Sequence, residues 1–255
     1  MIKTIKKLTL LLAAYASTLV SASFDHSLFD AVLSDHVKQG LADYAAIAKD
    51  SRIDTYLDSL AAADLDNLGS EQEKLAFYIN AYNAYTLKLV ALAYPTQSIR
   101  LIDGLGKVAK SIDDGKPWKI EFADLGGNVY SLDHIEHEIL RKEFNEPRIH
   151  FAIVCAAISC PVLRNEAYTA DKLEHQLESQ GRWFFSKRNF FDPKNKIAQL
   201  SKILEWFEAD FGGSKEAVLK FAIPYVNRQT ATSLETSVQD WTVNYLFYDW
   251  KLNTQ

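Results

Sequence analysis

The sequence predicts an α+β fold, a single helix-rich domain with a small central sheet. Apolar residues recur at helical spacing through much of residues 24–93. Residues 118–130 alternate like a β-hairpin around Gly126 and Gly127, and residues 149–155 form the continuous apolar run typical of a buried strand. Because the chain has no internal repeat, low-complexity segment or flexible linker, one domain over residues 23–255 is the simplest organisation.

Local signals place the individual elements. Residues 24–49 and 52–63 carry apolar residues at helical spacing. Ser70 and Glu73 form a capping box that begins a long helix, which should end near Ala93, before Pro95. The remaining elements are expected as a surface loop over residues 103–117, a helix over 131–144 capped by Ser131, a helix from Thr169 to about Lys187, a strand over 197–200, and a short helix over 201–211 closed by Gly212 and Gly213.

The first 22 residues have the pattern of a secretory signal peptide. Lys3, Lys6 and Lys7 precede an apolar stretch over residues 8–20, and small residues before Ser23 suit cleavage after Ala22. The stretch is too short to cross a bilayer comfortably, although an uncleaved anchor is the alternative. We therefore expect a periplasmic or secreted protein with no stable membrane insertion after cleavage.

Composition and charge exclude several classes of protein. Apolar residues make up 48% of the chain and charged residues 24%, which excludes global disorder and collagen. The net charge is −5, from 28 basic and 33 acidic residues, and loss of three signal-peptide lysines makes it −8. No basic run with interleaved aromatic residues occurs, so nucleic acid is not an expected partner.

Asn80 and Asn83 lie on the buried face of the long helix predicted over residues 70–93, which is apolar nearly all round. A buried amide needs partners, because leaving one unpaired costs about 1–3 kcal/mol. Two interpretations follow. These amides line a site and orient a ligand or catalytic group, or they tie the helix to a loop backbone.

The helix after Ser131 places Glu136 inside its apolar face and His137 at the edge of that face. Asp133 and Arg141 stand four residues before and after His137, within reach of its imidazole. A carboxylate on an apolar face either pairs or has a raised pKa, which is common at active sites. The alternative is a buried tether between Glu136 and an arginine or an amide.

His150, Cys155 and Cys160 form a third feature. His150 falls on the predicted strand, Cys155 ends it, and Cys160 lies in the loop beyond. A cysteine and a histidine can supply a nucleophile and its base, although a lone buried histidine is more often a core residue. In an exported protein the two cysteines can also form a disulfide. The spacing His-x4-Cys-x4-Cys does not match the usual zinc sites, and we expect no metal or other cofactor.

Five segments resemble, in order, the motifs of the bacterial and plant "domain of unknown function 547" family. They are HVKQGLADY at 36–44, FYINAYNA at 77–84, SLDHIEHEILR at 131–141, HFAIVCAAISCP at 150–161 and YDWKLN at 248–253. Tyr78 stands where the family usually has tryptophan. The resemblance implies that residues 23–255 are a domain of this type and agrees with export, but the family has no assigned activity. Its eukaryotic relatives fused to glutaredoxin-like domains imply thiol chemistry by association alone.

The leading hypothesis is an exported Cys/His-dependent hydrolase or acyltransferase that acts on an amide or thiol centre of a small-molecule or protein substrate in the cell envelope. Cys160 would be the nucleophile, and His150 or His137 the base. Glu136 or an asparagine amide would orient the imidazole. The residue types resemble those of papain-like and transglutaminase-like proteins by analogy, without the local signatures of those families.

In this enzyme hypothesis Asn80 or Asn83 would also help to stabilise an oxyanion. Two other hypotheses remain open. One is a non-catalytic binding module in which Cys155 and Cys160 form a structural disulfide. The other is a redox-active dithiol protein, although Cys-x4-Cys is looser than the Cys-x-x-Cys that tunes such sites. The distance from Cys160 to the nearest histidine and the state of the two thiols separate the three hypotheses.

Overall fold

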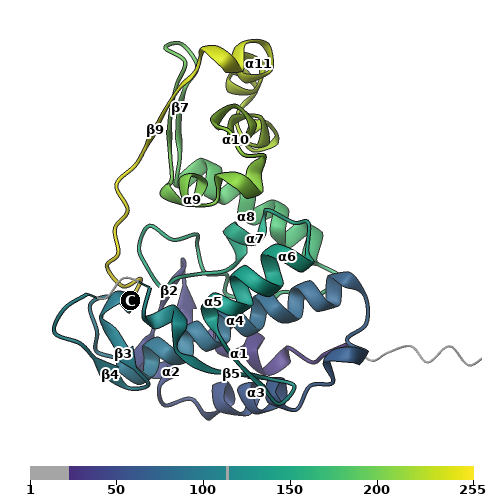
Figure 1. Cartoon of the computed structure of the whole chain (residues 1–255), viewed down its shortest axis with the longest axis vertical. Helices are drawn as coiled ribbons and strands as arrows, with labels where there is room; N and C mark the ends of the chain where they lie inside the picture. Colours follow the sequence, from purple (N-terminus) through teal and green to yellow (C-terminus); the bar gives the residue numbers. More distant parts are fainter. Residues whose placement is uncertain (1–22, 113–114) are drawn as a thin grey trace, which may run out of the picture.

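The computed structural model describes residues 23–112 and 115–255 (Figure 1). The predicted signal peptide, residues 1–22, lies outside the described residues. The predicted α+β class is confirmed: helices dominate, and the sheets have two or three strands. Figure 1 shows a lower part built around α4 (Glu71–Ala93) and an upper part that carries the C-terminal helices and strands.

Helix α4 is the centre of the lower part, and sixteen of its 23 residues are buried. The predicted capping box is present, with the Glu73 amide donating to Ser70 Oγ and the Ser70 amide to Glu73 Oε2. Helices α2 (Tyr44–Ile47) and α3 (Ser51–Ala61) pack against it, and α1 (Ser27–His36) packs against α2 and α3. Burial of apolar side chains on nearly every face of α4 makes it the main scaffold of the fold.

The helix predicted over residues 131–144 has three parts. Ser131 caps it as expected, because its Oγ accepts the His134 amide at 3.1 Å. It continues as α5 (Leu132–His134), then as the π-helix η4 (Ile135–Leu140), then as α6 (Arg141–Glu143). π-turns inside helices are rare and occur often at functional sites.

The prediction of a strand over residues 149–155 is wrong. The segment begins as the helical turn α7 (Ile149–Ala152) and continues without regular structure to Cys155. A fully apolar run does not distinguish a buried strand from a buried helix, since neither exposes a polar face. His150 therefore does not alternate along a strand with Val154.

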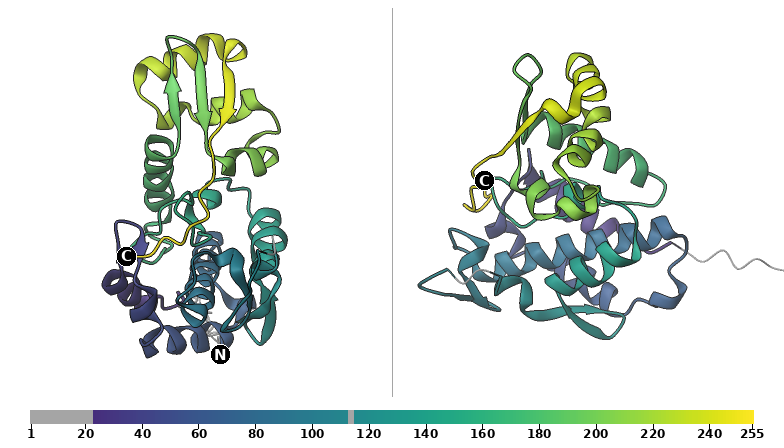
Figure 2. Two further views of the ribbon diagram at one scale, coloured as in Figure 1. Left: turned by 90° about the vertical axis from the view of Figure 1, so that its left-hand side faces the viewer. Right: turned by 45° about the horizontal axis from the view of Figure 1, so that its top comes forward.

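The largest sheet lies in the upper part rather than at the centre of the molecule (Figure 2). It contains β7 (Phe190–Asp192), β8 (Ile197–Leu200) and β9 (Thr242–Tyr245), with β8 antiparallel to β7 and parallel to β9. The upper helices are α8 (Leu173–Lys187), α9 (Lys202–Trp206), α10 (Lys215–Phe221) and α11 (Arg228–Ser237). Helix α8 begins after Lys172, so Thr169 does not cap it.

The remaining strands form short antiparallel pairs. The predicted hairpin is confirmed as β5 (Glu121–Leu125) and β6 (Asn128–Ser131). The expected loop after residue 102 contains a second small hairpin. The other elements are β1 (Val37–Lys38), β2 (Leu41–Ala42), β3 (Ile102–Gly104), β4 (Lys107–Val108) and the 3-10 turns η1 (Leu65–Asn67), η2 (Ile99–Leu101), η3 (Pro117–Lys119), η5 (Glu208–Phe211), η6 (Ile223–Tyr225) and η7 (Val238–Asp240).

After β9 the chain returns to the lower part, as the yellow C-terminal segment in Figure 2 shows. We call residues 246–255 the C-terminal strap. The Asn253 amide donates to the Ala156 carbonyl at 3.1 Å, and the Ile158 amide donates to the Lys251 carbonyl at 2.8 Å. The strap is therefore fixed against the loop between the two cysteines.

Candidate functional site

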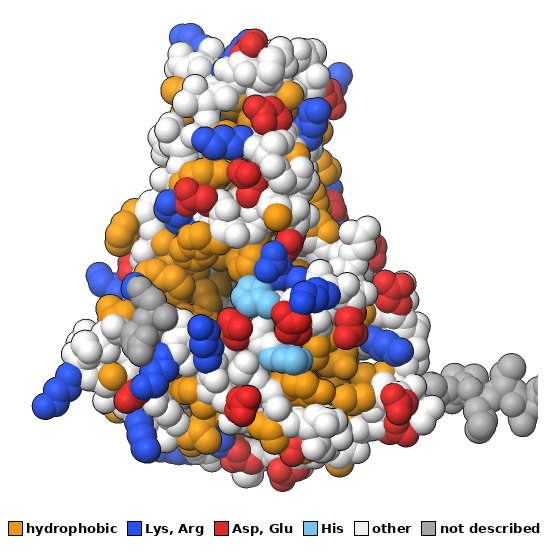
Figure 3. Space-filling model, viewed as in Figure 1, with side chains coloured by type: hydrophobic (Ala, Val, Ile, Leu, Met, Phe, Trp, Pro, Cys, Tyr) orange, Lys and Arg blue, Asp and Glu red, His pale blue; other side chains and the backbone are white. Residues whose placement is uncertain are grey.

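A cavity of about 400 Å³ lies where the lower and upper parts meet. Figure 3 shows a hollow with hydrophobic side chains on its walls and charged and histidine side chains along one edge. Both thiols and most of the predicted site residues open onto this one cavity. Its lining comprises Tyr82, Arg100, Gly115, Trp118, Asp133, Glu136, His137, His150, Ile153, Val154, Cys155, Cys160, Ile203, Trp206, Phe207 and Trp250.

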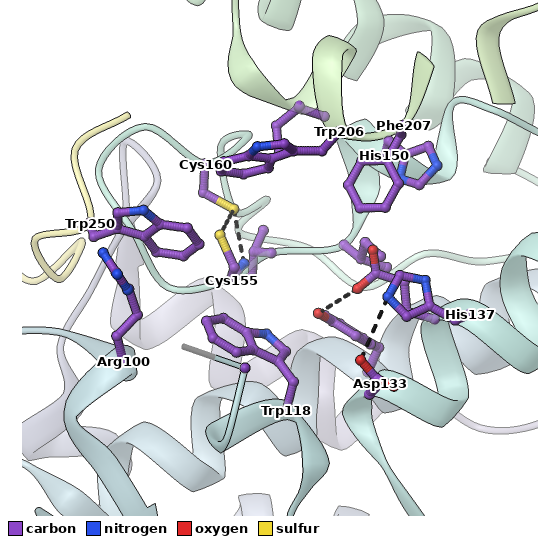
Figure 4. A pocket seen from close by; sticks show the side chains of 16 residues that line it. Arg100, Trp118, Asp133, His137, His150, Cys155, Cys160, Trp206, Phe207 and Trp250 are labelled. Atoms are coloured by element: carbon purple, nitrogen blue, oxygen red, sulfur yellow. Dashed lines mark hydrogen bonds and ion pairs between the residues drawn. The ribbon is translucent and has the colours of Figure 1, made fainter. Parts of the chain in front are cut away.

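Cys155 and Cys160 are free thiols with their sulfur atoms 2.9 Å apart. The Cys155 thiol donates to Cys160 Sγ, and the Cys155 backbone amide donates to the same atom at 2.9 Å (Figure 4). The pair is not at bonding distance, since a disulfide needs about 2.05 Å. The structural disulfide expected in the binding-module hypothesis is therefore not present.

The two thiols differ in acidity. Burial alone would raise the pKa of Cys160, but hydrogen bonds from the Cys155 thiol and amide and from Tyr248 stabilise the thiolate and lower this pKa below its usual value. Burial, and then the hydrogen bond and charge of Cys160, raise the pKa of Cys155 well above its usual value. Cys160 is therefore the thiolate-forming member of the pair.

The loop between the cysteines has a defined backbone. Ala156 adopts a left-handed conformation with φ of 55°, which is uncommon for a residue other than glycine. The Asn253 amide holds its carbonyl, and the Cys160 amide bonds to the Ala157 carbonyl at 3.1 Å. Because of this turn, the Cys155 amide and the Cys155 thiol both donate to Cys160 Sγ. Sequence spacing alone does not predict this arrangement.

Glu136 lies on a different wall of the cavity, on η4. Its carboxyl is buried and accepts a hydrogen bond from the Tyr82 hydroxyl at 3.0 Å. Burial raises the pKa of Glu136 to about 7, against the opposing effects of Tyr82 and Arg141. A carboxyl with this pKa can both accept and release a proton near neutral pH.

His137 is the neighbour of Glu136 on the cavity edge and is about one-third exposed. Its Nε2 lies 3.6 Å from Asp133 Oδ1, and its Nδ1 accepts from Arg141 Nη1 at 3.0 Å. Burial, partly offset by Asp133, lowers the pKa of His137. Both i,i+4 contacts predicted for this histidine are therefore present.

His150 is almost fully buried and binds Asp210 on η5, with Nε2 2.7 Å from Oδ2. Its ring stacks on Phe207 with centroids 3.9 Å apart. Arg141 donates to both oxygens of Asp210, at 2.6 and 2.8 Å. Burial lowers the pKa of His150, so the neutral ring donates to the carboxylate.

No histidine nitrogen hydrogen-bonds to either sulfur in residues 23–112 and 115–255. Figure 4 shows His150 and His137 on the other side of the cavity from the two cysteines. The sequence-derived expectation that His150 or His137 acts directly as the base for Cys160 is not what this geometry provides.

The comparisons with known proteins identify the family. The profile described as "Protein of unknown function, DUF547" matches residues 65–185. This segment is a DUF547 domain. No curated protein and no solved structure matches the chain. The analogy to papain-like and transglutaminase-like proteins therefore stays a prediction.

The DUF547 segment supplies only part of the cavity. It contains Glu136, His137 and both cysteines, and three of the five resemblance motifs fall within it. Trp206, Phe207 and Trp250 lie beyond residue 185 and complete the lining. Asp210 and Tyr248 also lie beyond it and contact the lining residues His150 and Cys155. The sequence gives one sign of this contribution, since Tyr248 and Trp250 belong to the last of those motifs.

Within the DUF547 domain, the side chains of Asn80 and Asn83 hydrogen-bond to backbone groups. The Asn80 amide exchanges two hydrogen bonds with Tyr168, at 2.7 and 2.9 Å. Asn83 accepts from the Val154 amide and donates to the Ala152 carbonyl, both at 3.0 Å. Neither side chain lines the cavity, so neither is placed to stabilise an oxyanion there. Asn83 instead fixes the segment that leads into Cys155.

In the part of the chain that the structure describes, no group of three or more histidine, cysteine or acidic side chains could hold a metal ion. No described helix is both long and apolar enough to cross a membrane. The two thiols and the acid–base groups Glu136 and His137 line the same cavity.

Proposed function

We propose that this protein is a thiol–disulfide oxidoreductase in which Cys160 is the nucleophile and Cys155 the resolving thiol. One observation carries the proposal: the Cys155 thiol and amide both donate to Cys160 Sγ at 2.9 Å, inside a cavity large enough for a ligand. Hydrogen bonds of this kind stabilise a thiolate, which is the attacking species in thiol–disulfide exchange.

The reaction has two exchange steps. The Cys160 thiolate attacks one sulfur of a substrate disulfide, the substrate S–S bond breaks, and one substrate thiolate leaves. Cys155, once deprotonated, attacks Cys160 Sγ in the mixed disulfide, and the second substrate thiolate leaves. The substrate is reduced and the cysteine pair is oxidised. A dithiol or monothiol reductant must return the pair to its thiol form.

The cavity walls favour a disulfide that carries apolar or aromatic groups. Trp118, Trp206 and Trp250 surround the sulfur atoms in Figure 4. Trp206 and Trp250 stack with centroids 5.7 Å apart, and Trp250 meets Trp118 edge-on at 5.8 Å. Aromatic walls of this kind bind flat apolar groups through burial and stacking.

The test is the reaction of the reduced full-length protein with a neutral aromatic disulfide such as 4,4′-dithiodipyridine, followed by intact mass. Wild type should form an intramolecular disulfide and release both halves of the reagent. Cys155→Ser should stop at a mixed disulfide on Cys160, and Cys160→Ser should react no faster than the unfolded protein. Equal reactivity of Cys155 and Cys160 in these matched variants would overturn the proposal.

Acyl transfer by Cys160 is a second candidate, favoured by one observation. Glu136 and His137 open onto the same cavity, so a bound carbonyl compound would lie near a thiolate and two acid–base groups. Incubation with an aromatic ester separates the candidates. An acyl adduct on Cys160 that forms equally well in Cys155→Ser supports acyl transfer, because that reaction needs only one thiol.

We also propose that the protein works in an exported compartment, on the basis of the pattern in residues 1–22. Expression of the full chain in a bacterial host, followed by fractionation and mass spectrometry, tests this. The expected product lies outside the cytoplasm and begins at Ser23. A cytoplasmic product that retains its first residues contradicts the proposal.

A further inference from the structure

The resolving step of the proposed reaction is helped by a proton acceptor, because burial raises the pKa of Cys155, and this effect persists when Cys160 is in the mixed disulfide. At neutral pH this thiol keeps its proton, and a thiol is a far weaker nucleophile than a thiolate. The histidines do not contact it. A basic group in the same cavity would therefore speed the attack of Cys155 on the mixed disulfide.

Glu136 is the candidate for this role. Its carboxyl is buried in the wall of the same cavity, and its charge contributes to the raised pKa of Cys155. The π-turn η4 sets its position: the Arg141 amide bonds to the Glu136 carbonyl five residues back, which widens the helix at this residue.

Tyr82 interacts with this carboxyl by a hydrogen bond and with both thiols electrostatically. It projects from α4 into the cavity and donates its hydroxyl proton to Glu136 Oε2 at 3.0 Å. Burial and then the charge of Glu136 raise the pKa of Tyr82, and both cysteine thiolates raise it further. Tyr82 is therefore within electrostatic range of Glu136, Cys155 and Cys160 together.

The charged groups around Glu136 come from several elements. Arg141 on α6 favours the carboxylate, while Asp133 on α5 and Asp210 on η5 oppose it. Tyr82 on α4 also favours the carboxylate, and burial opposes it most strongly. The balance leaves a carboxyl that exchanges a proton near neutral pH, as a group that accepts and later releases one must.

Resting on the proposed oxidoreductase function, we infer that Glu136 accepts the proton of the Cys155 thiol during resolution, with Tyr82 holding the carboxylate toward the thiols. In this step the Cys155 S–H bond breaks and its proton passes to Glu136, directly or through one water. Cys155 Sγ bonds to Cys160 Sγ, and the bond between Cys160 and the substrate sulfur breaks. Glu136 then releases the proton to solvent or to the departing substrate thiolate.

The test is a single-turnover reaction of reduced protein with 4,4′-dithiodipyridine, with the two exchange steps timed separately. Attack by Cys160 gives the first equivalent of thiopyridone, and resolution by Cys155 gives the second. Glu136→Gln should leave the first step within about twofold of wild type and slow the second about tenfold or more. The second step of wild type should accelerate as Glu136 ionises around pH 7, and Glu136→Gln should lack this inflection.

Glu138→Gln is the matched control. Glu138 lies on the same π-helix, but its side chain is about half exposed and pairs with Lys142. It should keep both rates and the inflection. Tyr82→Phe retains the carboxyl and removes the hydroxyl, and it should shift the inflection of the second step upward, because Tyr82 favours the carboxylate.

The outcomes distinguish the two proposals. If wild type never forms a mixed disulfide on Cys160, the oxidoreductase proposal fails, and this inference fails with it. If wild type forms and resolves the mixed disulfide, but Glu136→Gln resolves it at the same rate with the same pH profile, only the role of Glu136 is refuted. A folded Tyr82→Phe protein gives an independent reading if Glu136→Gln does not fold.

Discussion

The Tyr248 hydroxyl lies 3.0 Å from Cys155 Sγ, although 93 residues separate the two in the chain. Because the Cys155 thiol donates to Cys160, its sulfur is free to accept the phenol proton. The result is a chain of hydrogen bonds from Tyr248 through Cys155 to Cys160, and each donor in it polarises the next. The C-terminal strap therefore contributes directly to the acidity of the thiols.

Tyr248→Phe should raise the pKa of both thiols, because the hydroxyl lowers the pKa of Cys155 and of Cys160. The ring remains and keeps its contacts with Trp206 and Trp250. The pH dependence of iodoacetamide labelling, read by mass, measures the change. Tyr245→Phe is the control, since the Tyr245 hydroxyl faces Glu208 at 3.5 Å. Identical labelling profiles in both variants would show that Tyr248 only fills space.

The two cysteines should also differ when each is alone. In Cys155→Ala, the Cys160 thiolate loses one donor and keeps the backbone amide of residue 155, so its pKa rises but stays below that of Cys155. In Cys160→Ala, burial keeps the pKa of Cys155 high. Labelling near neutral pH should therefore be faster at Cys160 in the first variant than at Cys155 in the second. The reverse order would assign the nucleophile to Cys155.

Local sequence signals predicted the lower part of the fold well. The capping box of Ser70 and Glu73, the cap at Ser131 and the hairpin at Gly126 depend on residues a few positions apart, and all are present. The strand predicted over residues 149–155 is wrong, because burial on all sides removes the periodicity that separates strand from helix. Glu136 and His137 were found for the opposite reason: polar residues interrupt a clear apolar face.

The thiol environment could not be predicted from spacing. The contact between Cys155 and Cys160 depends on the left-handed turn at Ala156. Alanine rarely adopts this conformation, so the sequence does not predict the turn. Tyr248 and Asp210 reach the site across long sequence separations. Each is one polar or aromatic residue among many, and only the packing of the upper part on the lower part selects it.

Asn83→Ala should destabilise the protein by about 2–4 kcal/mol, because it leaves the Val154 amide and the Ala152 carbonyl buried without partners. It should also alter thiol labelling, since these groups lie just before Cys155. Asn80→Ala removes an equivalent pair of bonds to Tyr168 and should cost a similar amount without changing the labelling profile. Urea unfolding and iodoacetamide labelling of both variants test this. Equal effects on the thiols would contradict a local role for Asn83.

Asp210 joins the two parts of the molecule, since it binds His150 and Arg141 from η5. Burial alone would raise the pKa of Asp210, but these hydrogen bonds lower it well below its usual range. Its stabilisation is therefore present above the unfolded pKa of about 3.9 and is lost as pH falls through the lower, folded value. Asp210→Asn should lower the free energy of unfolding by about 1–3 kcal/mol at neutral pH, a range that allows for its partial exposure.

The unfolding free energies of wild type and Asp210→Asn should depend differently on pH. Below about pH 6.5 both proteins should lose stability, because burial lowers the pKa of His150 and the unfolded chain binds the proton first. Asp210→Asn should lose more, because Asp210 raises the pKa of His150, so the difference in unfolding free energy between the two proteins should grow as His150 takes up its proton. In stronger acid the difference should shrink, as Asp210 itself is protonated. Urea unfolding at a series of pH values measures both effects. A difference that does not shrink in strong acid would show that Asp210 is not held as a carboxylate by His150 and Arg141.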